Sequence, residues 1–173
     1  MCFSWRSACR LRLAKGGLGS TKADTLVGTS GNDTIIGNGG NDTFIGGGGA
    51  DLLMAGSGSD TFIFKAIADS TPFSHDTIVN FNHTNDTIQF TGVAGINSSR
   101  GIAMFEGQLT GSGNLTLNAH SLGYIEVGGN TVVLVNTTNN AETVTASDVH
   151  AANMKIVLSG THLGLAGNDF HVI

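Results

Sequence analysis

An aspartate recurs at every ninth residue near the start of the chain, and this spacing constrains the fold more than any other feature. Five consecutive nonapeptides run from Gly19 to Ile63, and the glycine-free unit 64–72 that follows keeps Asp69 in the same register. Such self-similarity is the signature of repeat architectures, so the chain is expected to wind into stacked, nearly identical turns. The sixth position of the five repeats is occupied by Asp24, Asp33, Asp42, Asp51 and Asp60.

Each nonapeptide has two chemically different halves. The first half is rich in Gly, Asn and Asp, which suit tight turns and positive φ. The second half reads Thr-apolar-apolar in four of the five units, which suits a very short strand. Adjacent strands lie roughly 4.8 Å apart, so stacking places equivalent side chains in rows. The eighth position predicts an inward apolar row of Leu26, Ile35, Phe44, Leu53 and Phe62.

Stacking also predicts rows of aspartates along the turns. Carboxylates packed so closely repel one another, and residues 23–64 contain no basic side chain that could neutralise them. A divalent cation resolves this repulsion. Carboxylate and carbonyl oxygens suit calcium, whereas zinc prefers the His and Cys ligands that the repeats lack. The alternative is a glycine-rich solenoid in which the aspartates serve only as turn formers.

The repeats resemble the G-G-x-G-x-D-x-U-x units of the RTX (hemolysin-type) calcium-binding proteins, which wind into a parallel β-roll. In that family two nonapeptides make one coil, and calcium lies between the turns of repeats n and n+2. The resemblance implies three aspartate pairs: Asp24 with Asp42, Asp33 with Asp51, and Asp42 with Asp60. Lys22 replaces a glycine of the first unit, which weakens the Asp24 pair. The implied carbonyl ligands are Thr29 and Gly31 facing Gly46 and Gly48, and Asn38 and Gly40 facing Ala55 and Ser57.

The segment after the repeats resembles the corresponding stretch in the C-terminal domain of serralysin-type M10 metallopeptidases. An acidic Asp-Ser turn is followed there by two short strands, each opened by an aspartate. In this chain those strands are expected to begin at Asp76 and Asp86. The resemblance implies that Asp69, Asp76 and Asp86 are further calcium ligands; turn acids that merely flank strands are the alternative. About three or more bound Ca²⁺ ions are expected.

Short strand signals continue to the C-terminus, with a tight hairpin expected at Gly128-Gly129 and a loop over 136–153. The predicted fold is therefore all-β: a parallel β-roll over 19–72, then an antiparallel, sandwich-like β cap over 73–173. Residues 1–18 form an atypical basic tail that is expected to be disordered. The expected strands of the last part are 102–105, 115–118, 124–127, 131–135, 155–158 and 170–173.

The charge distribution excludes several classes of protein. Four basic residues and no acidic ones lie in the first fifteen positions, which leaves 4 basic and 13 acidic residues, a net charge of −9, for the remainder. Nucleic-acid binding needs a basic surface, so an acidic body favours a cationic partner instead. The sequence has no apolar run of about 18 residues, so no membrane-spanning helix is expected.

Catalytic motifs are absent from the sequence. There is no H-E-x-x-H zinc motif, no G-x-S-x-G elbow and no phosphate-binding loop, so enzymatic activity is not expected. RTX proteins are secreted, and their uncleaved C-terminus, here Asp169 to Ile173, is read by a type I secretion apparatus. The resemblance thus implies an extracellular, calcium-folded secretion module. It leaves open a stand-alone adhesion or accessory protein, and a tail detached from an upstream catalytic domain.

Overall fold

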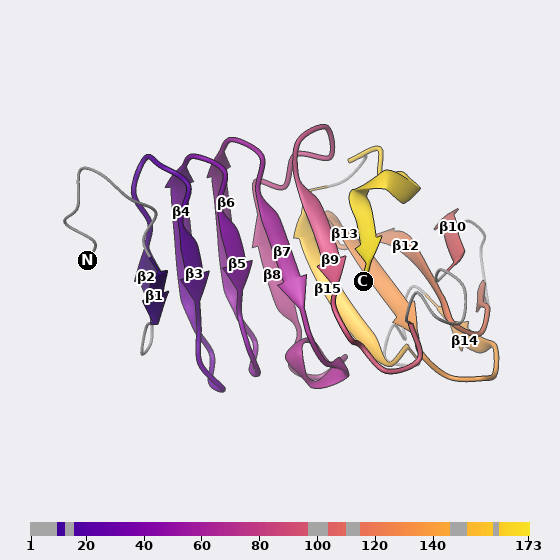
Figure 1. Cartoon of the computed structure of the whole chain (residues 1–173). Coiled ribbons are helices and arrows are strands. Elements are labelled where there is room, and N and C mark those ends of the chain that lie inside the picture. The colour runs from indigo at the N-terminus through magenta and orange to yellow at the C-terminus, as the bar shows by residue number, and fades with distance from the viewer. Residues whose placement is uncertain (1–9, 13–15, 97–103, 110–114, 146–151, 161–162) are drawn as a thin grey trace.

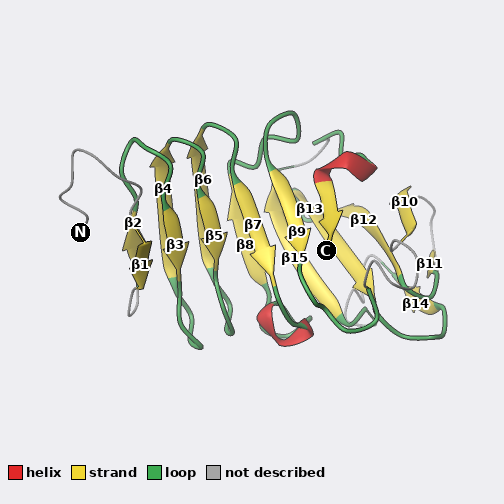
Figure 2. Cartoon of the chain, in the orientation of Figure 1, coloured by secondary structure: helices red, strands yellow, loops and turns green. Residues whose placement is uncertain are grey.

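The chain folds into two β-sheets laid against each other, with a small third sheet on one side (Figures 1 and 2). This computed structural model describes residues 10–12, 16–96, 104–109, 115–145, 152–160 and 163–173. The six-stranded sheet has the order β1 (Arg10–Arg12), β3 (Thr25–Val27), β5 (Thr43–Ile45), β7 (Thr61–Phe64), β9 (Thr87–Phe90) and β16 (Phe170–Val172).

The eight-stranded sheet faces the six-stranded one. Its order is β10 (Met104–Gln108), β12 (Ser121–Val127), β13 (Asn130–Asn136), β15 (Met154–Ser159), β8 (Asp76–Val79), β6 (Leu52–Ser57), β4 (Thr34–Gly39) and β2 (Gly17–Leu18). The two-stranded sheet pairs β11 (Leu115–Leu117) with β14 (Glu142–Val144). Two short 3₁₀ turns are also described, η1 (Ile67–Asp69) and η2 (Gly167–Asp169).

The repeats form the predicted parallel β-roll. Successive nonapeptides alternate between the two sheets, so equivalent residues of one sheet are 18 positions apart; Leu26 pairs with Phe44, and Ile35 with Leu53. The glycines of the turns permit this close stacking. Gly47, for example, has a φ of +97° and its α-carbon faces the Thr29 carbonyl so closely that a side chain would overlap it.

The predicted inward apolar row is confirmed. Leu26, Ile35, Phe44, Leu53 and Phe62 are at most 1% exposed and lie in one core between the two large sheets. The rings of Phe44 and Phe62 stack with their centroids 4.8 Å apart. Burial of these side chains is the main apolar contribution to the roll, at about 1.5–3 kcal/mol each.

The C-terminal part is not a separate sandwich, because its strands extend both sheets of the roll. β15 runs parallel beside β8, β16 runs parallel beside β9, and the antiparallel pairs are β12–β13 and β13–β15. Parallel pairing therefore continues past residue 72, through β8 and β9 to β15 and β16. The hairpin at Gly128-Gly129 is confirmed, with φ of +61° and +81° at the two glycines.

A second, smaller core lies on the outer face of the eight-stranded sheet, opposite the main core. It comprises Leu117, Ile125, Val132, Leu134, Val144, Ala152 and Val157. β14 supplies one of these residues, so the expected loop over 136–153 is wrong at Glu142–Val144. The expected strand at 102–105 lies partly outside the described residues.

Two segments of the basic tail also differ from expectation. β1 pairs in parallel with β3, and β2 pairs in parallel with β4, so Arg10–Arg12 and Gly17–Leu18 are strands rather than a disordered arm. Across the described residues, no helix is long and apolar enough to span a membrane.

Candidate metal sites in the turns of the roll

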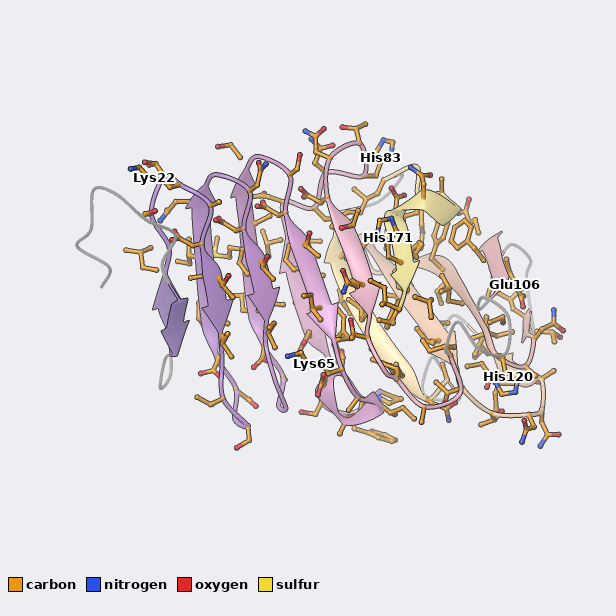
Figure 3. The ribbon with its side chains drawn as sticks, viewed as in Figure 1. Lys22, Lys65, His83, Glu106, His120 and His171 are labelled. Atoms are coloured by element: carbon orange, nitrogen blue, oxygen red, sulfur yellow. The ribbon has the colours of Figure 1, made fainter. Side chains whose placement is uncertain are left out.

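The repeat aspartates form two rows on opposite edges of the roll. Turns that lead into the six-stranded sheet carry Asp24, Asp42, Asp60 and Asp86; turns that lead into the eight-stranded sheet carry Asp33, Asp51 and Asp76. In Figure 3, Lys22 and His83 mark turns of the first edge at the top, and Lys65 begins the second-edge segment below. We call these rows the first and the second acidic ladder.

A regular hydrogen bond links neighbouring rungs within each ladder. The Oδ1 atom of each aspartate accepts the backbone N–H of the aspartate one coil earlier. The Asp24 N–H donates to Asp42 Oδ1 at 2.8 Å, and the Asp42 N–H donates to Asp60 Oδ1 at 2.8 Å. In the second ladder, the Asp33 N–H donates to Asp51 Oδ1 at 2.9 Å. The structure thus brings together all three aspartate pairs that the resemblance implied. The ladders continue through Asp51 to Asp76 and Asp60 to Asp86, both at 2.9 Å.

The second carboxylate oxygen divides the aspartates into two groups. In the first rung of each ladder, Oδ2 accepts hydrogen bonds from a residue four positions earlier, which closes the turn. Ser20 binds Asp24 through its N–H at 2.6 Å and its hydroxyl at 2.8 Å. Thr29 binds Asp33 with the same two distances. These hydroxyl caps were not predicted, although a Ser or Thr four residues before the aspartate is visible in the sequence.

Among the described residues, four buried carboxylate oxygens of the later rungs have no hydrogen-bond partner. They are the Oδ2 atoms of Asp42, Asp51, Asp60 and Asp76, and all four side chains are at most 2% exposed. A buried, unpaired carboxylate oxygen is costly unless a cation or donor satisfies it. These four rungs therefore have unmet demand for positive charge, which Asp24 and Asp33, the first rung of each ladder, do not share.

Backbone carbonyls approach the carboxylate oxygens of the ladders beside the first glycine of a unit. A Cβ built on Gly37 would lie 2.5 Å from Asp42 Oδ2 and 2.6 Å from the Ala55 carbonyl oxygen. On the other edge, a Cβ on Gly28 would overlap the Gly46 oxygen and lie 2.8 Å from Asp33 Oδ2. The space that these glycines leave is thus a cradle lined by one carboxylate and one carbonyl.

The remaining carbonyl ligands implied by the resemblance also lie in facing turns. The Gly48 N–H donates to the Thr29 oxygen at 3.2 Å, and the Gly40 N–H donates to the Ser57 oxygen at 2.9 Å. The Asn38 oxygen lies against the α-carbon of Gly56, and the Gly31 oxygen lies against that of Gly49. All eight carbonyl positions therefore occur in pairs of stacked turns. Thr29 and Ser57 already accept a backbone hydrogen bond there.

Asp69 is not a rung of either ladder, contrary to the extrapolated nine-residue register. Its Oδ2 accepts the N–H groups of Lys65 at 2.6 Å and Ala66 at 3.1 Å, which closes the turn around η1. Asp76 takes the place after Asp51, at a step of 25 residues instead of 18. The unit 64–72 lacks the glycines needed for a tight turn, so the chain makes a longer excursion there.

Burial and crowding raise the pKa values of the interior carboxyls. Desolvation is the largest cause, hydrogen bonds from backbone N–H groups oppose it, and neighbouring aspartates add to it. The pKa is raised from 3.8 to about 6 at Asp42 and Asp51, and to about 8 at Asp76. Burial also raises the pKa of Asp60 and Asp86. Asp69 contributes to the shifts at Asp51 and Asp76 through its charge.

These shifts predict opposite effects of pH on the metal-free and the metal-bound protein. A folded-state pKa above the unfolded value of 3.8 means that the contribution to stability is complete below about pH 4. It is lost as pH rises through about 6 and then about 8. Calcium displaces the same protons, so its affinity is expected to rise by up to about tenfold per pH unit for each proton released.

Urea unfolding of the metal-free protein and calorimetric calcium titration, each at several pH values, check both trends. Repeating the titration in buffers of different ionisation enthalpy counts the protons released. A calcium affinity that stays constant between about pH 5 and 7 would contradict this assignment of protonated interior carboxyls.

The donor set fits calcium. The described turns offer carboxylate pairs and carbonyl oxygens, which are the hard ligands that calcium accepts in flexible geometry. No group of three or more His, Cys, Asp or Glu side chains gathers in the part of the chain that the structure describes. The oxygens of any one site would therefore come largely from the backbone.

Filling a cradle with a methyl group is expected to remove metal binding without removing a ligand. In Gly37→Ala the new Cβ meets Asp42 Oδ2, the Ala55 oxygen and, at 2.8 Å, the Phe44 ring. We expect a loss of about 1–3 kcal/mol from overpacking, with weaker calcium binding. Gly31→Ala is the matched control, because its nearest neighbour, Thr29 Oγ1, lies 3.9 Å away. Thermal unfolding with and without calcium compares the two, and equal behaviour would contradict the cradle.

The comparisons with known proteins agree with this geometry. Residues 18–53 and 27–62 match the model of the RTX calcium-binding nonapeptide repeat, which spans four copies. The chain thus contains RTX calcium-binding repeats folded as a parallel β-roll. Such repeats bind Ca²⁺, are generally non-catalytic and typically occur in extracellular proteins. None of the curated proteins matches the chain.

A solved structure shows the same fold over nearly the whole chain. The AlgE6R2 subunit of the Azotobacter vinelandii mannuronan C5-epimerase superposes with a TM-score of 0.60 at 22% identity, covering 96% of this chain and 92% of that one. The AlgE6R3 subunit of the same enzyme has a TM-score of 0.34 at 23% identity, covering 88% and 80%. The resemblance of the later segment to serralysin-type C-terminal domains is not confirmed by these matches.

Proposed function

We propose that the chain binds about three or more calcium ions between the turns of its roll, and that this binding drives its folding. The observation that carries the proposal is the set of four buried carboxylate oxygens without a hydrogen-bond partner. In the proposed sites, Asp42 pairs with Asp24 and with Asp60, and Asp33 pairs with Asp51. Carbonyl oxygens such as those of Ala55 and Gly46 complete the shell.

Metal-free ladders are expected to be poorly stable near neutral pH. Ionised neighbours repel one another within each row, and ordering glycine-rich turns costs about 1–2 kcal/mol per residue of backbone entropy. A bound calcium ion supplies the missing positive charge, and its binding free energy becomes folding free energy. Extracellular calcium modules have dissociation constants of roughly 10⁻⁴–10⁻³ M, so folding would wait for the calcium-rich exterior.

This calcium dependence suits a module that is secreted unfolded. The proposed type I signal, Asp169 to Ile173, overlaps β16, and the N–H of Ile173 donates to the Phe90 oxygen at 2.9 Å. A secretion apparatus would therefore read these residues only before the roll has folded. The proposed extracellular location and secretion role both depend on calcium-dependent folding and would be rejected with it.

A non-catalytic module of a larger extracellular enzyme is the second candidate. AlgE6R2 is a subunit of an epimerase, and its superposition covers 96% of this chain and 92% of its own length. A detached protease tail and a stand-alone calcium-dependent adhesion or accessory protein are the remaining versions of this role. Calcium-dependent retention on a polysaccharide surface would favour the adhesion role, and a longer upstream reading frame would favour the module.

The first experiment is a calcium titration of chelator-treated protein followed by far-ultraviolet circular dichroism, with magnesium as control. We expect a gain of β signal at submillimolar to millimolar calcium and none with magnesium, which prefers tight octahedral sites. A spectrum that is already rich in β structure and indifferent to calcium would mean that the aspartates are turn formers, and the proposed function would be rejected.

A further inference from the structure

One asparagine of the roll is followed directly by a glycine. Asn38-Gly39 is the single Asn-Gly pair in the whole sequence, and it ends β4. Asn38 has a φ of +75°, in the left-handed region that asparagine tolerates better than most residues. Its side chain is exposed, whereas Gly39 is buried. In such a pair the asparagine amide reacts readily with the backbone, because glycine has no Cβ to obstruct the approach.

The reaction is deamidation through a cyclic imide. The Gly39 nitrogen attacks Asn38 Cγ, the N–Cγ bond forms as the Cγ–Nδ2 bond breaks, and Nδ2 leaves as ammonia with the proton of the Gly39 N–H. Water then opens the ring. Attack at Cγ gives an aspartate at this position, and attack at the α-carbonyl gives isoaspartate, whose main chain runs through the side-chain carboxyl. One water is consumed and one ammonia is released, so no oxidant or reductant is needed.

In the folded roll, the neighbouring coils fix both reacting groups. Asn38 Nδ2 donates to the Gly19 oxygen on the preceding coil at 2.9 Å. Gly39 pairs with Ser57 on the following coil, and a Cβ built on Gly39 would lie 2.9 Å from Ser57 Oγ. Ring closure moves both groups, since Cγ must come within bonding distance of the Gly39 nitrogen. The reaction therefore requires this turn to open first, as in local unfolding.

Either product damages the turn once it has formed. Isoaspartate inserts an extra methylene into the main chain, whereas the Asn38 oxygen already lies against the α-carbon of Gly56, with no room for a side chain between them. An aspartate loses the Nδ2 donor and turns a carboxylate oxygen toward the Gly19 carbonyl oxygen, where it has no hydrogen bond to accept. The deamidated turn is therefore expected to stack poorly on the coils before and after it.

We propose that Asn38-Gly39 is a site of spontaneous deamidation that stacking of the coils protects. The modification converts an open roll irreversibly into a chain that no longer folds. This inference rests on the proposed function, because calcium then sets how long the chain stays competent to fold. Deamidation is slow compared with closing of a turn, so its rate follows the population of the open roll. Calcium at 100-fold above the dissociation constant of one site lowers that population, and the rate, by at least about 100-fold.

The test is incubation of the full chain at mildly alkaline pH, with calcium and, in parallel, with chelator. Trypsin cleaves after Lys22 and Lys65, and no other lysine or arginine lies between them. The single peptide that results carries Asn32, Asn38 and Asn41. Tandem mass spectrometry locates the mass change within this peptide, and enzymatic methylation counts isoaspartate. We expect modification of Asn38 in chelator and at least about 100-fold slower modification with saturating calcium.

The same peptide contains its own controls. Asn32 and Asn41 are exposed in equivalent turns, but each is followed by an aspartate instead of a glycine. Both should react more slowly than Asn38 in chelator, because the Cβ of the following residue obstructs the attack. Equal deamidation of Asn38 with and without calcium, or faster modification at either control, overturns the inference.

Asn38→Gly tests the consequence for folding. Glycine adopts a φ of +75° without strain and has no amide to lose. After incubation in chelator, the wild type should lose its calcium-induced gain of β signal in proportion to its deamidated fraction, whereas Asn38→Gly should keep the gain. Deamidated wild type that folds as fully as fresh protein overturns the inference, and this comparison holds even if the variant does not fold. Fresh wild type whose β signal ignores calcium overturns the proposed function instead, which keeps the two failures distinct.

Discussion

Asp42→Ala is expected to cost more calcium-dependent stability than any other single aspartate substitution in the repeats. Asp42 belongs to the pairs with Asp24 and Asp60, and its Oδ2 is one of the four unpartnered oxygens. Losing two sites at a calcium concentration 100-fold above the dissociation constant removes about 5 kcal/mol, since each site contributes about 2.7 kcal/mol. Urea unfolding with and without calcium measures this difference.

Asp24→Ala is the matched control within the same ladder. The Oδ2 of Asp24 is already satisfied by Ser20, and its unit carries Lys22 in place of a glycine. We expect it to lose only the Asp24–Asp42 site, about 2.7 kcal/mol of calcium-dependent stability at the same calcium concentration, besides about 0.5–1.5 kcal/mol from the broken turn. Equal calcium affinity in the two variants would contradict the assignment of the sites.

Phe62→Ala is expected to destabilise the calcium-loaded roll by about 3–5 kcal/mol, independently of how far calcium exceeds saturation. The Phe62 ring is fully buried, stacks on Phe44 and lies 6.1 Å from the Phe81 ring. A loss of this size is a large share of the roughly 5–15 kcal/mol that stabilises a domain. Thermal unfolding at two saturating calcium concentrations should show the same deficit at both.

Ile63→Ala provides the comparison for this core variant. Ile63 follows Phe62 on β7 and is only half-buried, because its side chain lies on the outer face of the sheet. We expect it to cost well under half as much, since less apolar surface leaves water on folding. Similar losses for the two variants would show that the inward face of the strand has been assigned incorrectly.

The regular part of the fold could be predicted because one period sets both geometry and chemistry. Two nonapeptides make one coil of 18 residues, which places Asp24 next to Asp42 and Leu26 next to Phe44 on adjacent coils. The same reasoning fails at Asp69, where the sequence keeps the period but lacks the glycines that make the turn. A register depends on turn residues as much as on the residue that recurs.

The C-terminal part could be predicted less well, because its signals are not periodic. β13 reads Thr-Val-Val-Leu-Val, an apolar run that suits burial on both faces, and it does contribute to two cores. The sequence does not show which segment covers the second face. β14 is only three residues long and polar at its start, so it carries almost no strand signal of its own.

The sequence alone does not show which carboxylate oxygens have a hydrogen-bond partner and which have none. All five repeat aspartates occupy the same position of the nonapeptide, yet Asp33 Oδ2 is held by Thr29 whereas Asp51 Oδ2 has no partner. The difference depends on the second residue of the unit, which is Thr29 in the unit of Asp33 and Gly47 in the unit of Asp51. The nonapeptide pattern assigns only a backbone carbonyl to that position, so it does not predict the hydroxyl cap.

Sharing of rungs has a consequence for the shape of the calcium response. Because Asp42 belongs to two pairs, an ion that fixes its carboxylate for one pair also prepares it for the next. Sites linked in a row in this way behave as a one-dimensional array with nearest-neighbour coupling. Occupancy of each ladder should therefore rise steeply over a narrow range of calcium, with a Hill coefficient above one. Under the proposed function, such a roll would pass from empty and unfolded to filled and folded over a narrow range of calcium concentration.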